Sequence, residues 1–284
     1  MRFLVLGCNG MAGHMISCYL SERGHDVTGL ARRKSKYVKT IVGDARNEDL
    51  VCNTIIEGKY DYVVNCIGIL NAFAEENKTV AVYLNSYLPH YLANITQDME
   101  TSIIHMSTDC VFSGYKGAYT ENDLRDGTTF YDRTKALGEL DDDKNLTLRT
   151  SIVGPDIDAS GIGLLNWFMK QGQSVNGFTK AIWTGQTTLQ LAKTMEIAAK
   201  EKATGLYNMV PNSSINKYEL LVLFNHYLRN DSLEIHPVEG VKLDKSLIRT
   251  KFEFGYEIPD YEKMVCELAE WMRKHKAMYP HYKL

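Results

Sequence analysis

The segment that decides the fold is Phe3-Leu4-Val5-Leu6-Gly7-Cys8-Asn9-Gly10-Met11-Ala12-Gly13. Its short apolar run is typical of a strand that is buried on both faces of a parallel sheet. Glycines with G-x-x-G-x-x-G spacing follow, before a helical pattern over about residues 12–22. Glycine permits a tight turn and close approach of a pyrophosphate, and a helix N-terminus offers free N–H groups to phosphate oxygens. We therefore predict a dinucleotide site formed by Gly7, Asn9, Gly10, Met11, Ala12 and Gly13.

Strands and helices alternate along the rest of the first half of the chain. Strands are predicted at residues 27–30, 40–43, 61–68, 102–106 and 146–150, and helices at about 79–96 and 130–140. Such alternation implies right-handed crossovers and a doubly wound parallel sheet. Beyond about Gly154 the pattern loosens into amphipathic helices at 163–171, 189–200, 217–228 and 261–274. The predicted fold is α/β, a Rossmann-type doubly wound parallel sheet with a smaller mixed α/β substrate-binding region.

The expected domain division follows these patterns. Residues 1–153, with about 181–203, are predicted to form the dinucleotide-binding Rossmann domain, and about 154–180 with 204–284 the smaller substrate-binding region. The end of the chain, with basic Lys274-His275-Lys276 and several tyrosines, is predicted to be an exposed tail.

Composition narrows the class of protein. The chain has 284 residues, of which 44% are hydrophobic, and a net charge of -3. This balance does not favour binding to nucleic acid or to an anionic membrane surface. The six cysteines are scattered without zinc-ligand spacing, so we expect reduced thiols, no metal and a cytoplasmic location. No apolar run approaches the roughly 20 residues that span a bilayer.

The end of the second predicted strand bears on cofactor choice. NAD-binding proteins usually have an acidic residue there to hold the ribose 2′-hydroxyl. Here the stretch is Leu30-Ala31-Arg32-Arg33-Lys34, without an acid. Arg32 or Arg33 could bind a 2′-phosphate bidentately, which favours NADPH. NADH binding and a merely solvated basic loop remain the alternatives.

A tyrosine and a lysine four residues apart, Tyr131 and Lys135, share one face of the predicted helix over residues 130–140. A nearby ammonium would lower the phenol pKa from about 10 toward neutrality, which suits acid–base catalysis. Ser107 and Thr108 end a predicted strand, where open α/β sheets present groups to ligands. Y-x-x-x-K alone is more often a surface pair, but the preceding glycine loop and strand end favour a catalytic site.

Three segments together carry a family resemblance: residues 105–112 (HMSTDCVF), 131–139 (YDRTKALGE) and 148–151 (LRTS). They resemble the extended short-chain dehydrogenase/reductase superfamily. Within it, they are most similar to the dTDP-4-dehydrorhamnose reductases and related sugar-nucleotide 4-ketoreductases. The resemblance runs over roughly residues 1–155 and continues more faintly to the end.

The resemblance implies a role for each matched residue. Thr108 would orient and polarise a sugar ketone, Tyr131 would protonate the developing alkoxide, and Lys135 would tune Tyr131 and hold the nicotinamide ribose. Ser107 is expected beside the substrate. Asn85 would be the superfamily's structural or proton-relay asparagine. The remaining implied cofactor contacts are Gly10, Met11 and Ala12 at the pyrophosphate, Asp44 and Ala45 at the adenine, and Cys66, Ile67 and Gly68 beside the ribose.

The chain departs from the family pattern at three places. Asp132 follows the tyrosine where glycine is usual, and we expect it to face solvent. Ile152 stands where the rhamnose reductases have a tryptophan that meets the sugar. Their D-Q-x-G-x-P-T segment is reduced to residues 183–188, WTGQTT. The last two departures leave the identity of the sugar open.

Other members of the superfamily give the alternatives. A 4,6-dehydratase would show T-D-E, whereas this chain has Thr108-Asp109-Cys110. An epimerase or epimerase-reductase would use a cysteine near Cys110 with a histidine partner, but no histidine occurs between His105 and His226. Cys110 is therefore more simply a core or pocket-lining residue. A non-catalytic NADP-binding regulatory subunit is the third alternative, although the chain keeps threonine, tyrosine and lysine.

The prediction that results is NADPH-dependent reduction of the 4-keto group of a nucleoside-diphosphate 4-keto-6-deoxysugar, in deoxysugar or surface polysaccharide biosynthesis. The expected partner is the nucleotide sugar. A homodimer is also considered, because Tyr83, Tyr87 and Tyr91 recur at helical spacing and predict a packed helix face.

Overall fold

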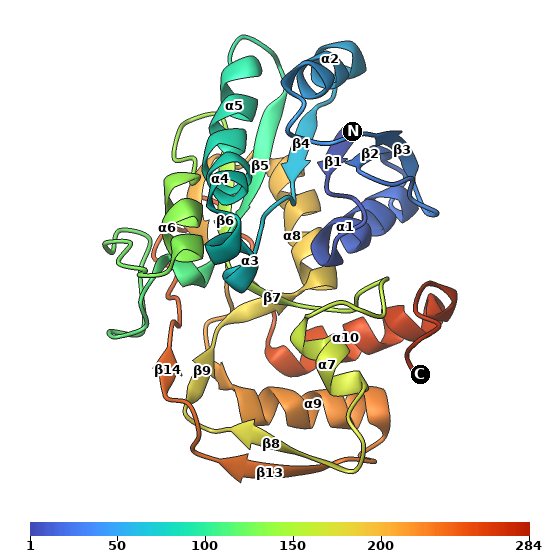
Figure 1. The fold of residues 1–284 in the computed structure, drawn as a ribbon, viewed down its shortest axis with the longest axis vertical. Coiled ribbons are helices and arrows are strands. Elements are labelled where there is room, and N and C mark those ends of the chain that lie inside the picture. The colour runs from blue at the N-terminus through green and yellow to red at the C-terminus, as the bar shows by residue number, and fades with distance from the viewer.

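Seven parallel strands form the central sheet of the computed structural model, which describes residues 1–284. The order across the sheet is β11-β6-β5-β4-β1-β2-β3 (Figure 1). The strands are β1 (Arg2–Leu6), β2 (Asp26–Ala31), β3 (Lys39–Val42), β4 (Tyr62–Asn65), β5 (Ser102–Ser107), β6 (Leu146–Arg149) and β11 (Gly205–Asn208). The order reverses between β1 and β4, and ligands of such sheets bind at the carboxyl ends of the strands beside that reversal.

Both faces of the sheet are covered, which explains the continuous apolar run of β1. Leu4 and Leu6 join the core under α2 (Glu48–Gly58) and α5 (Leu88–Ile95). Phe3 and Val5 point to the opposite face and join the core shared with α1 (Met11–Glu22) and α8 (Thr188–Glu201). Because alternate side chains of a strand point to opposite faces, both sets must be apolar. Figure 1 shows α1 and α8 on one side of the sheet and α5 on the other.

The connections at the carboxyl edge of the sheet are short helical pieces. After β4 come α3 (Asn71–Glu76), α4 (Lys78–Ala81) and the π-helical turn η1 (Val82–Tyr87), which runs directly into α5. After β5 come the 3₁₀ turn η2 (Asp109–Val111) and α6 (Phe130–Leu137). The helix predicted over 79–96 is therefore present, but a π-helical turn interrupts it.

The remaining elements build a smaller lobe, seen in the lower half of Figure 1. Its small sheets pair β10 with β7, β13 with β8, and both β12 and β14 with β9. The strands are β7 (Ser151–Val153), β8 (Ser174–Phe178), β9 (Ala181–Trp183), β10 (Gly185–Thr187), β12 (Ile215–Asn216), β13 (Glu234–Val238) and β14 (Leu243–Asp244). The helices are α7 (Leu164–Met169), α9 (Lys217–Arg229), α10 (Tyr261–Lys274) and the 3₁₀ turn η3 (Lys276–Met278).

The predicted α/β fold with a doubly wound parallel sheet is confirmed. The helix α2 was not predicted, and neither were β11 and most short strands of the smaller lobe, since strands of two to five residues carry little periodicity. The boundary predicted near residue 204 is wrong for β11, which is an edge strand of the large sheet. Strands β7, β9 and β10, which the division placed with the Rossmann domain, pair only within the small sheets. The remaining bounds of the division stay a prediction.

The tyrosine row on η1 and α5 packs along its own helix and against α2. Tyr87 lies between Tyr83 and Tyr91, with ring centroids 5.1 and 5.7 Å away. The hydroxyl groups of Tyr83 and Tyr91 donate hydrogen bonds to the side chain and the backbone carbonyl of Glu48, respectively. These contacts give the row an intramolecular role, and the homodimer stays a prediction.

The C-terminal segment corrects the prediction of an exposed tail. Tyr279 and Tyr282 are 1% and 7% exposed and belong to the large core. The Tyr279 hydroxyl lies 3.0 Å from Nε2 of His14 on α1, and the Tyr282 hydroxyl accepts a hydrogen bond from the Asp156 amide at 3.0 Å. Tyrosine suits such positions because its ring is apolar and its hydroxyl finds a partner.

No helix of the fold combines the length and apolarity that crossing a bilayer requires.

Replacing Tyr279 with phenylalanine tests this docking of the C-terminal segment. The variant removes the hydroxyl and leaves the buried His14 ring nitrogen without its partner, which should cost about 1–3 kcal/mol of unfolding free energy. Urea denaturation measures the loss. The control is Tyr227→Phe, whose hydroxyl bonds Glu262 at the surface and whose removal should change stability little. Equal stability of the two variants would contradict the assigned contact.

Candidate active site

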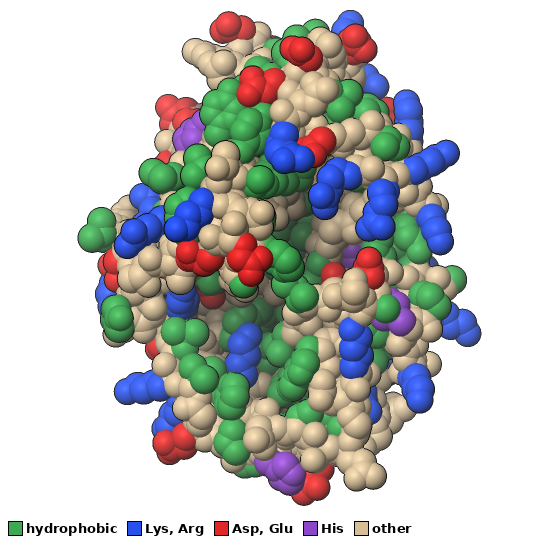
Figure 2. Space-filling model, in the orientation of Figure 1, with side chains coloured by type: hydrophobic (Ala, Val, Ile, Leu, Met, Phe, Trp, Pro, Cys, Tyr) green, Lys and Arg blue, Asp and Glu red, His purple; other side chains and the backbone are tan.

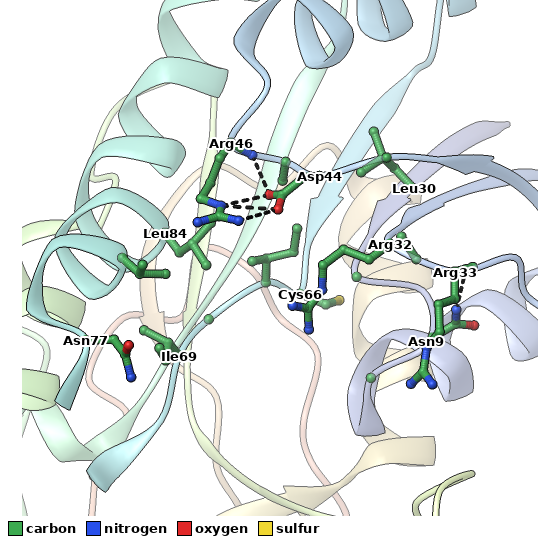
Figure 3. A pocket seen from close by; sticks show the side chains of 18 residues that line it. Asn9, Leu30, Arg32, Arg33, Asp44, Arg46, Cys66, Ile69, Asn77 and Leu84 are labelled. Atoms are coloured by element: carbon green, nitrogen blue, oxygen red, sulfur yellow. Dashed lines mark hydrogen bonds and ion pairs between the residues drawn. The ribbon is translucent and has the colours of Figure 1, made fainter. Parts of the chain in front are cut away.

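A cavity of about 550 Å³ opens at the carboxyl ends of β1, β2 and β4 (Figure 3). Ten residues predicted to bind a cofactor line it: Gly7, Asn9, Gly10, Arg32, Arg33, Asp44, Ala45, Cys66, Ile67 and Gly68. Lining residues that the prediction missed are Leu30, Ala31, Gly43, Arg46, Ile69, Asn77, Val80 and Leu84. In the space-filling view the surface is hollowed here, and lysine and arginine side chains stand beside the hollow (Figure 2).

The glycine loop has the backbone geometry that its sequence predicts. Gly7 has a φ of 79°, a left-handed conformation that favours glycine. A Cβ at Gly13 would overlap the carbonyl oxygen of Gly7, so only glycine lets α1 pack this closely on the loop. The helix begins at Met11 after Gly10, and no side chain caps its first amides. The N–H groups at this end are therefore available to an anionic ligand.

Three arginines border the cavity, one more than the sequence analysis identified. Asn9 donates a hydrogen bond to the carbonyl of Arg33 at 2.7 Å, which ties the glycine loop to the segment after β2. Across the cavity, Nη2 of Arg46 lies 2.6 Å from Oδ2 of Asp44 (Figure 3). Hydrogen bonds from Arg46 hold the pKa of the Asp44 carboxyl below its usual range. Arg32 and Arg33 have no ion-pair partner there and remain available to a phosphate.

Thr108 and Tyr131 meet at the end of β5. The Thr108 hydroxyl accepts a hydrogen bond from the Cys110 amide and donates one to Oδ1 of Asp109, both at 3.1 Å. Burial, reinforced by Cys110, raises the pKa of the Tyr131 phenol, and a hydrogen-bonding contact with Thr108 only partly offsets the rise. Tyr131 is therefore a protonated phenol at neutral pH.

Lys135 is buried one turn after Tyr131, but its ammonium is directed elsewhere. Nζ donates a hydrogen bond to the Met106 carbonyl at 2.7 Å and lies 3.4 Å from Nε2 of His105. Burial lowers the pKa of Lys135 to about 8, against an opposing effect of Glu139. The predicted lowering of the Tyr131 pKa by Lys135 is not seen, because Lys135 is not among the groups that shift this pKa and burial of the phenol raises it.

Asn85 occupies the π-helical turn η1 and is fully engaged in hydrogen bonds. Its Oδ1 accepts from the Ile69 amide at 2.9 Å, while Nδ2 donates to the Ile69 carbonyl and to Oγ1 of Thr134. These bonds join the loop after β4 to α6. Of the two roles considered for Asn85, the geometry supports the structural one.

Asp132 is buried, which corrects the prediction that it faces solvent. It is 4% exposed, and it forms a capping box in which its carboxylate accepts from the Thr129 amide and the Thr129 hydroxyl accepts from its own amide. Nζ of Lys245 lies 3.8 Å from Oδ2. A capping box satisfies two of the free amides at a helix start, so Asp132 stabilises the first turn of α6, where Tyr131 lies. Glycine at this position could not do so.

A buried ion pair joins strand β6 to the segment that follows α6. The Arg149 guanidinium, fully buried on β6, donates to both carboxylate oxygens of Glu139, at 2.8 and 2.7 Å. Burial raises the pKa of Glu139, but the bonds from Arg149 and Ser107 outweigh it and the net pKa is lowered. Ser107 donates its hydroxyl to Glu139 at 2.6 Å. Although Ser107 was predicted to contact substrate, its hydroxyl is committed to this carboxylate.

The smaller lobe adds an ammonium that the sequence analysis missed. Lys217 is the first residue of α9, and its Nζ lies 5.1 Å from the centroid of the Trp183 ring on β9. Burial lowers the pKa of Lys217 to about 8, and the nearby Asp109 and Cys110 partly offset this effect. Burial also raises the pKa of the Asp109 carboxyl and of the Cys110 thiol, the latter to about 12. The open side of Thr108 is thus bordered by groups from both lobes.

Comparison with known proteins gives one family match and consistent relatives. The model of the RmlD substrate binding domain family matches residues 1–253. A probable low-salt glycan biosynthesis reductase, Agl14, of Haloferax volcanii is 29% identical over 265 residues, which cover 88% of each chain. A dTDP-4-dehydrorhamnose reductase of Aggregatibacter actinomycetemcomitans is 29% identical over 157 residues, 53% of this chain and 51% of that protein.

A solved structure extends the likeness to the fold. The dTDP-4-dehydrorhamnose reductase of Bacillus anthracis, determined in complex with NADP, superposes with a TM-score of 0.78 at 18% identity. The match covers 94% of this chain and 98% of that one. At this identity the likeness shows a shared fold.

The buried ion pair can be tested by Glu139→Gln. The variant leaves the Arg149 guanidinium buried without its counter-ion, which should lower the unfolding free energy by about 3–5 kcal/mol. Urea denaturation followed by circular dichroism measures the change. Glu201→Gln, at the exposed end of α8, is the control and should leave stability nearly unchanged. A Glu139→Gln variant as stable as the control would show that the pair is dispensable.

Proposed function

The chain belongs to the RmlD substrate binding domain family, and from that premise we propose that it is an NADP(H)-dependent reductase of a nucleotide sugar. The reaction is reduction of the 4-keto group of a nucleoside-diphosphate 4-keto-6-deoxysugar, in the biosynthesis of a glycan. The observation that carries the proposal is the meeting of Thr108 and a protonated Tyr131 at the same sheet edge as the glycine-loop cavity.

The cavity fits a dinucleotide phosphate. The uncapped start of α1 and the close contact between Gly13 and Gly7 leave room and free amides for a diphosphate. Arg32 and Arg33 lie where β2 ends without an acidic residue, which favours a 2′-phosphate and hence NADPH over NADH. When bound, the reduced nicotinamide supplies a hydride to the substrate carbonyl carbon.

The side chains of the site supply the proton and hold the ketone. The Thr108 hydroxyl, which donates to Oδ1 of Asp109 in the structure, would turn its one proton to the carbonyl oxygen when substrate binds. Tyr131 transfers its phenolic proton to that oxygen as negative charge develops. The raised pKa keeps Tyr131 protonated at neutral pH, as an acid in the reducing direction must be. Buried as it is, the Lys135 ammonium stabilises the resulting phenolate more than it would in water.

The sugar end of the site is formed by the smaller lobe. Lys217 of this lobe lies over the Trp183 ring and near Asp109. Ile152 lies on β7 where the rhamnose reductases have a tryptophan. An ammonium and a carboxylate can hydrogen-bond sugar hydroxyls, acting as donor and acceptor respectively. We infer a sugar that uses polar contacts here, and the Haloferax relative named as a glycan biosynthesis reductase supports a role in glycan assembly.

The assay is consumption of NADPH with a panel of nucleoside-diphosphate 4-keto-sugars that includes dTDP-4-dehydrorhamnose. Turnover of one panel member is expected. Tight NADPH binding without any turnover would favour the non-catalytic alternative. The epimerase-reductase alternative has one observation in its favour, which is that the Cys110 thiol lies near enough to Tyr131 to raise the pKa of its phenol. It requires deuterium from heavy water in the product at the carbons beside the ketone.

Tyr131→Phe should reduce turnover by about 10²–10⁴-fold, because the proton donor is lost. Binding of NADPH, followed by fluorescence, should be nearly unchanged since the ring remains. The control is Tyr115→Phe, on an exposed loop, which should retain full activity. Retained turnover in Tyr131→Phe would disprove its role as the acid.

Arg32→Ala tests cofactor preference. Loss of a charge-assisted hydrogen bond to the 2′-phosphate should weaken NADPH binding by about 10- to 100-fold and leave NADH binding almost unchanged. Titration calorimetry with both cofactors measures the two dissociation constants, with Arg33→Ala and Arg46→Ala in parallel. Arg133→Ala, on the exposed face of α6, is the control. An equal loss for NADPH and NADH would exclude recognition of the phosphate by the replaced arginine.

A further inference from the structure

Three buried polar side chains form a line from the sheet to the catalytic helix. Asn65 on β4 and His105 on β5 are register partners in adjacent strands, and Nδ2 of Asn65 lies 3.2 Å from Nδ1 of His105. On the other side of the ring, Nε2 of His105 lies 3.4 Å from Nζ of Lys135. Asn65 and His105 are fully buried, and neither contacts the cavity. Asn65 and His105 have no role in the proposed reduction.

A backbone amide sets the direction of hydrogen bonding along this line. The Ile67 N–H donates to Oδ1 of Asn65 at 3.1 Å, and a backbone N–H can only donate. Oδ1 is therefore the acceptor end of the Asn65 amide, and its NH₂ group faces His105. Nδ1 of His105 must accept from that group. This tautomer follows from the hydrogen-bond network, as tautomers usually must.

The direction of these hydrogen bonds determines which His105 atom faces Lys135. Burial lowers the pKa of His105 well below its usual value, so the ring is neutral and carries one proton. With Nδ1 accepting, that proton is on Nε2 and points at Nζ of Lys135. An ammonium offers only donors, so an N–H would face an N–H. A neutral amine has a lone pair and accepts from Nε2.

We propose that His105 is a positioning residue that favours the neutral amine of Lys135 over its ammonium, through the hydrogen-bond direction that begins at the Ile67 amide. The part that this charge state plays in catalysis rests on the proposed function. After Tyr131 has protonated the alkoxide, the phenolate must regain a proton. Nζ of Lys135 is bonded to the Met106 carbonyl and not to Tyr131, so the Lys135 ammonium supplies that proton through an intervening water or hydroxyl group, leaving a phenol and a neutral amine. His105 then donates to that amine until it regains a proton from solvent. The Met106 carbonyl holds Nζ in place as an acceptor in both states.

The other groups around Lys135 act in known directions. Burial lowers its pKa to about 8, while Glu139, just beyond the C-terminus of α6, and the Cys66 thiol after β4 raise it. From α5, His90 also lowers the pKa of the buried His105, and its own ring is bonded to the Leu137 carbonyl. The donor of His105 adds to the effect of burial, and both favour the neutral amine.

Two substitutions of the same residue separate the donor from the remainder of the side chain. In His105→Gln the terminal amide reaches the place of Nε2 and can still donate to Lys135. In His105→Asn the shorter side chain can still accept from Asn65, but it does not reach Lys135. The pKa of Lys135 is measured in the full-length protein by NMR titration of labelled lysine, with Lys135→Met identifying the resonance. The asparagine variant should raise this pKa by about one unit, a tenfold change in the ratio of amine to ammonium. The glutamine variant should leave it close to its original value.

The tautomer gives a second test that needs no change at His105. NMR of ¹⁵N-labelled histidine in the unaltered protein should show the proton on Nε2 and none on Nδ1. In Asn65→Asp the carboxylate only accepts, so the proton should move to Nδ1 and the pKa of Lys135 should rise. A proton on Nδ1 in the unaltered protein would overturn the proposal, as would equal Lys135 pKa values in the glutamine and asparagine variants.

Activity separates this inference from the function on which it rests. The alkaline limb of the pH profile of kcat should follow the pKa of Lys135 upward in His105→Asn and return in His105→Gln. If the panel of 4-keto-sugars gives no turnover while the NMR differences appear, the proposed function fails and the charge control of Lys135 stands. If turnover is present and the NMR differences are absent, only the role of His105 is lost.

Discussion

The buried ion pair between Glu139 and Arg149 is the interaction on which the site depends. Arg149 belongs to β6, and Glu139 directly follows the helix that carries Tyr131 and Lys135, so the pair fixes that helix on the sheet. The same carboxylate accepts a hydrogen bond from the Ser107 hydroxyl, and Nη1 of Arg149 donates to the side chain of Asn208 on β11. A buried charge without its partner is costly, so these elements hold one relative arrangement. The ion pair also explains why the segments YDRTKALGE and LRTS occur together, since the first supplies Glu139 and the second supplies Arg149.

Close backbone contacts at two glycines also hold the helices of the site against their neighbours. Gly138 lies against the Asn85 carbonyl, where any Cβ would overlap it, and Asn85 in turn bonds the loop after β4. On the cofactor side, Gly13 lies equally close to Gly7. The two contacts draw α6 and α1 toward the same sheet edge from opposite faces. The proposed reduction needs both contacts, because Tyr131 on α6, its proposed acid, must lie beside a cofactor held at the start of α1.

Residues whose role depends on local pattern were foreseen, and those whose role depends on distant partners were not. The glycine loop and the strand ends follow from short-range rules, and ten predicted cofactor contacts line the cavity. Arg46 was missed because its place depends on how the chain turns after β3. Lys217 comes from an element more than 80 residues beyond Tyr131, and no pattern links the two. The burial of Asp132 was misjudged because its partners, Thr129 and Lys245, were not considered together.

By itself, the sequence determined the doubly wound sheet and the glycine loop. These depend on hydrophobic periodicity and on glycine geometry, which act between near neighbours along the chain. Tertiary structure alone decided the charge states at the site and the burial of the C-terminal tyrosines. Whether Tyr131 is a phenol and Lys135 an amine depends on desolvation and on hydrogen-bond direction, and both come from residues brought together only by folding.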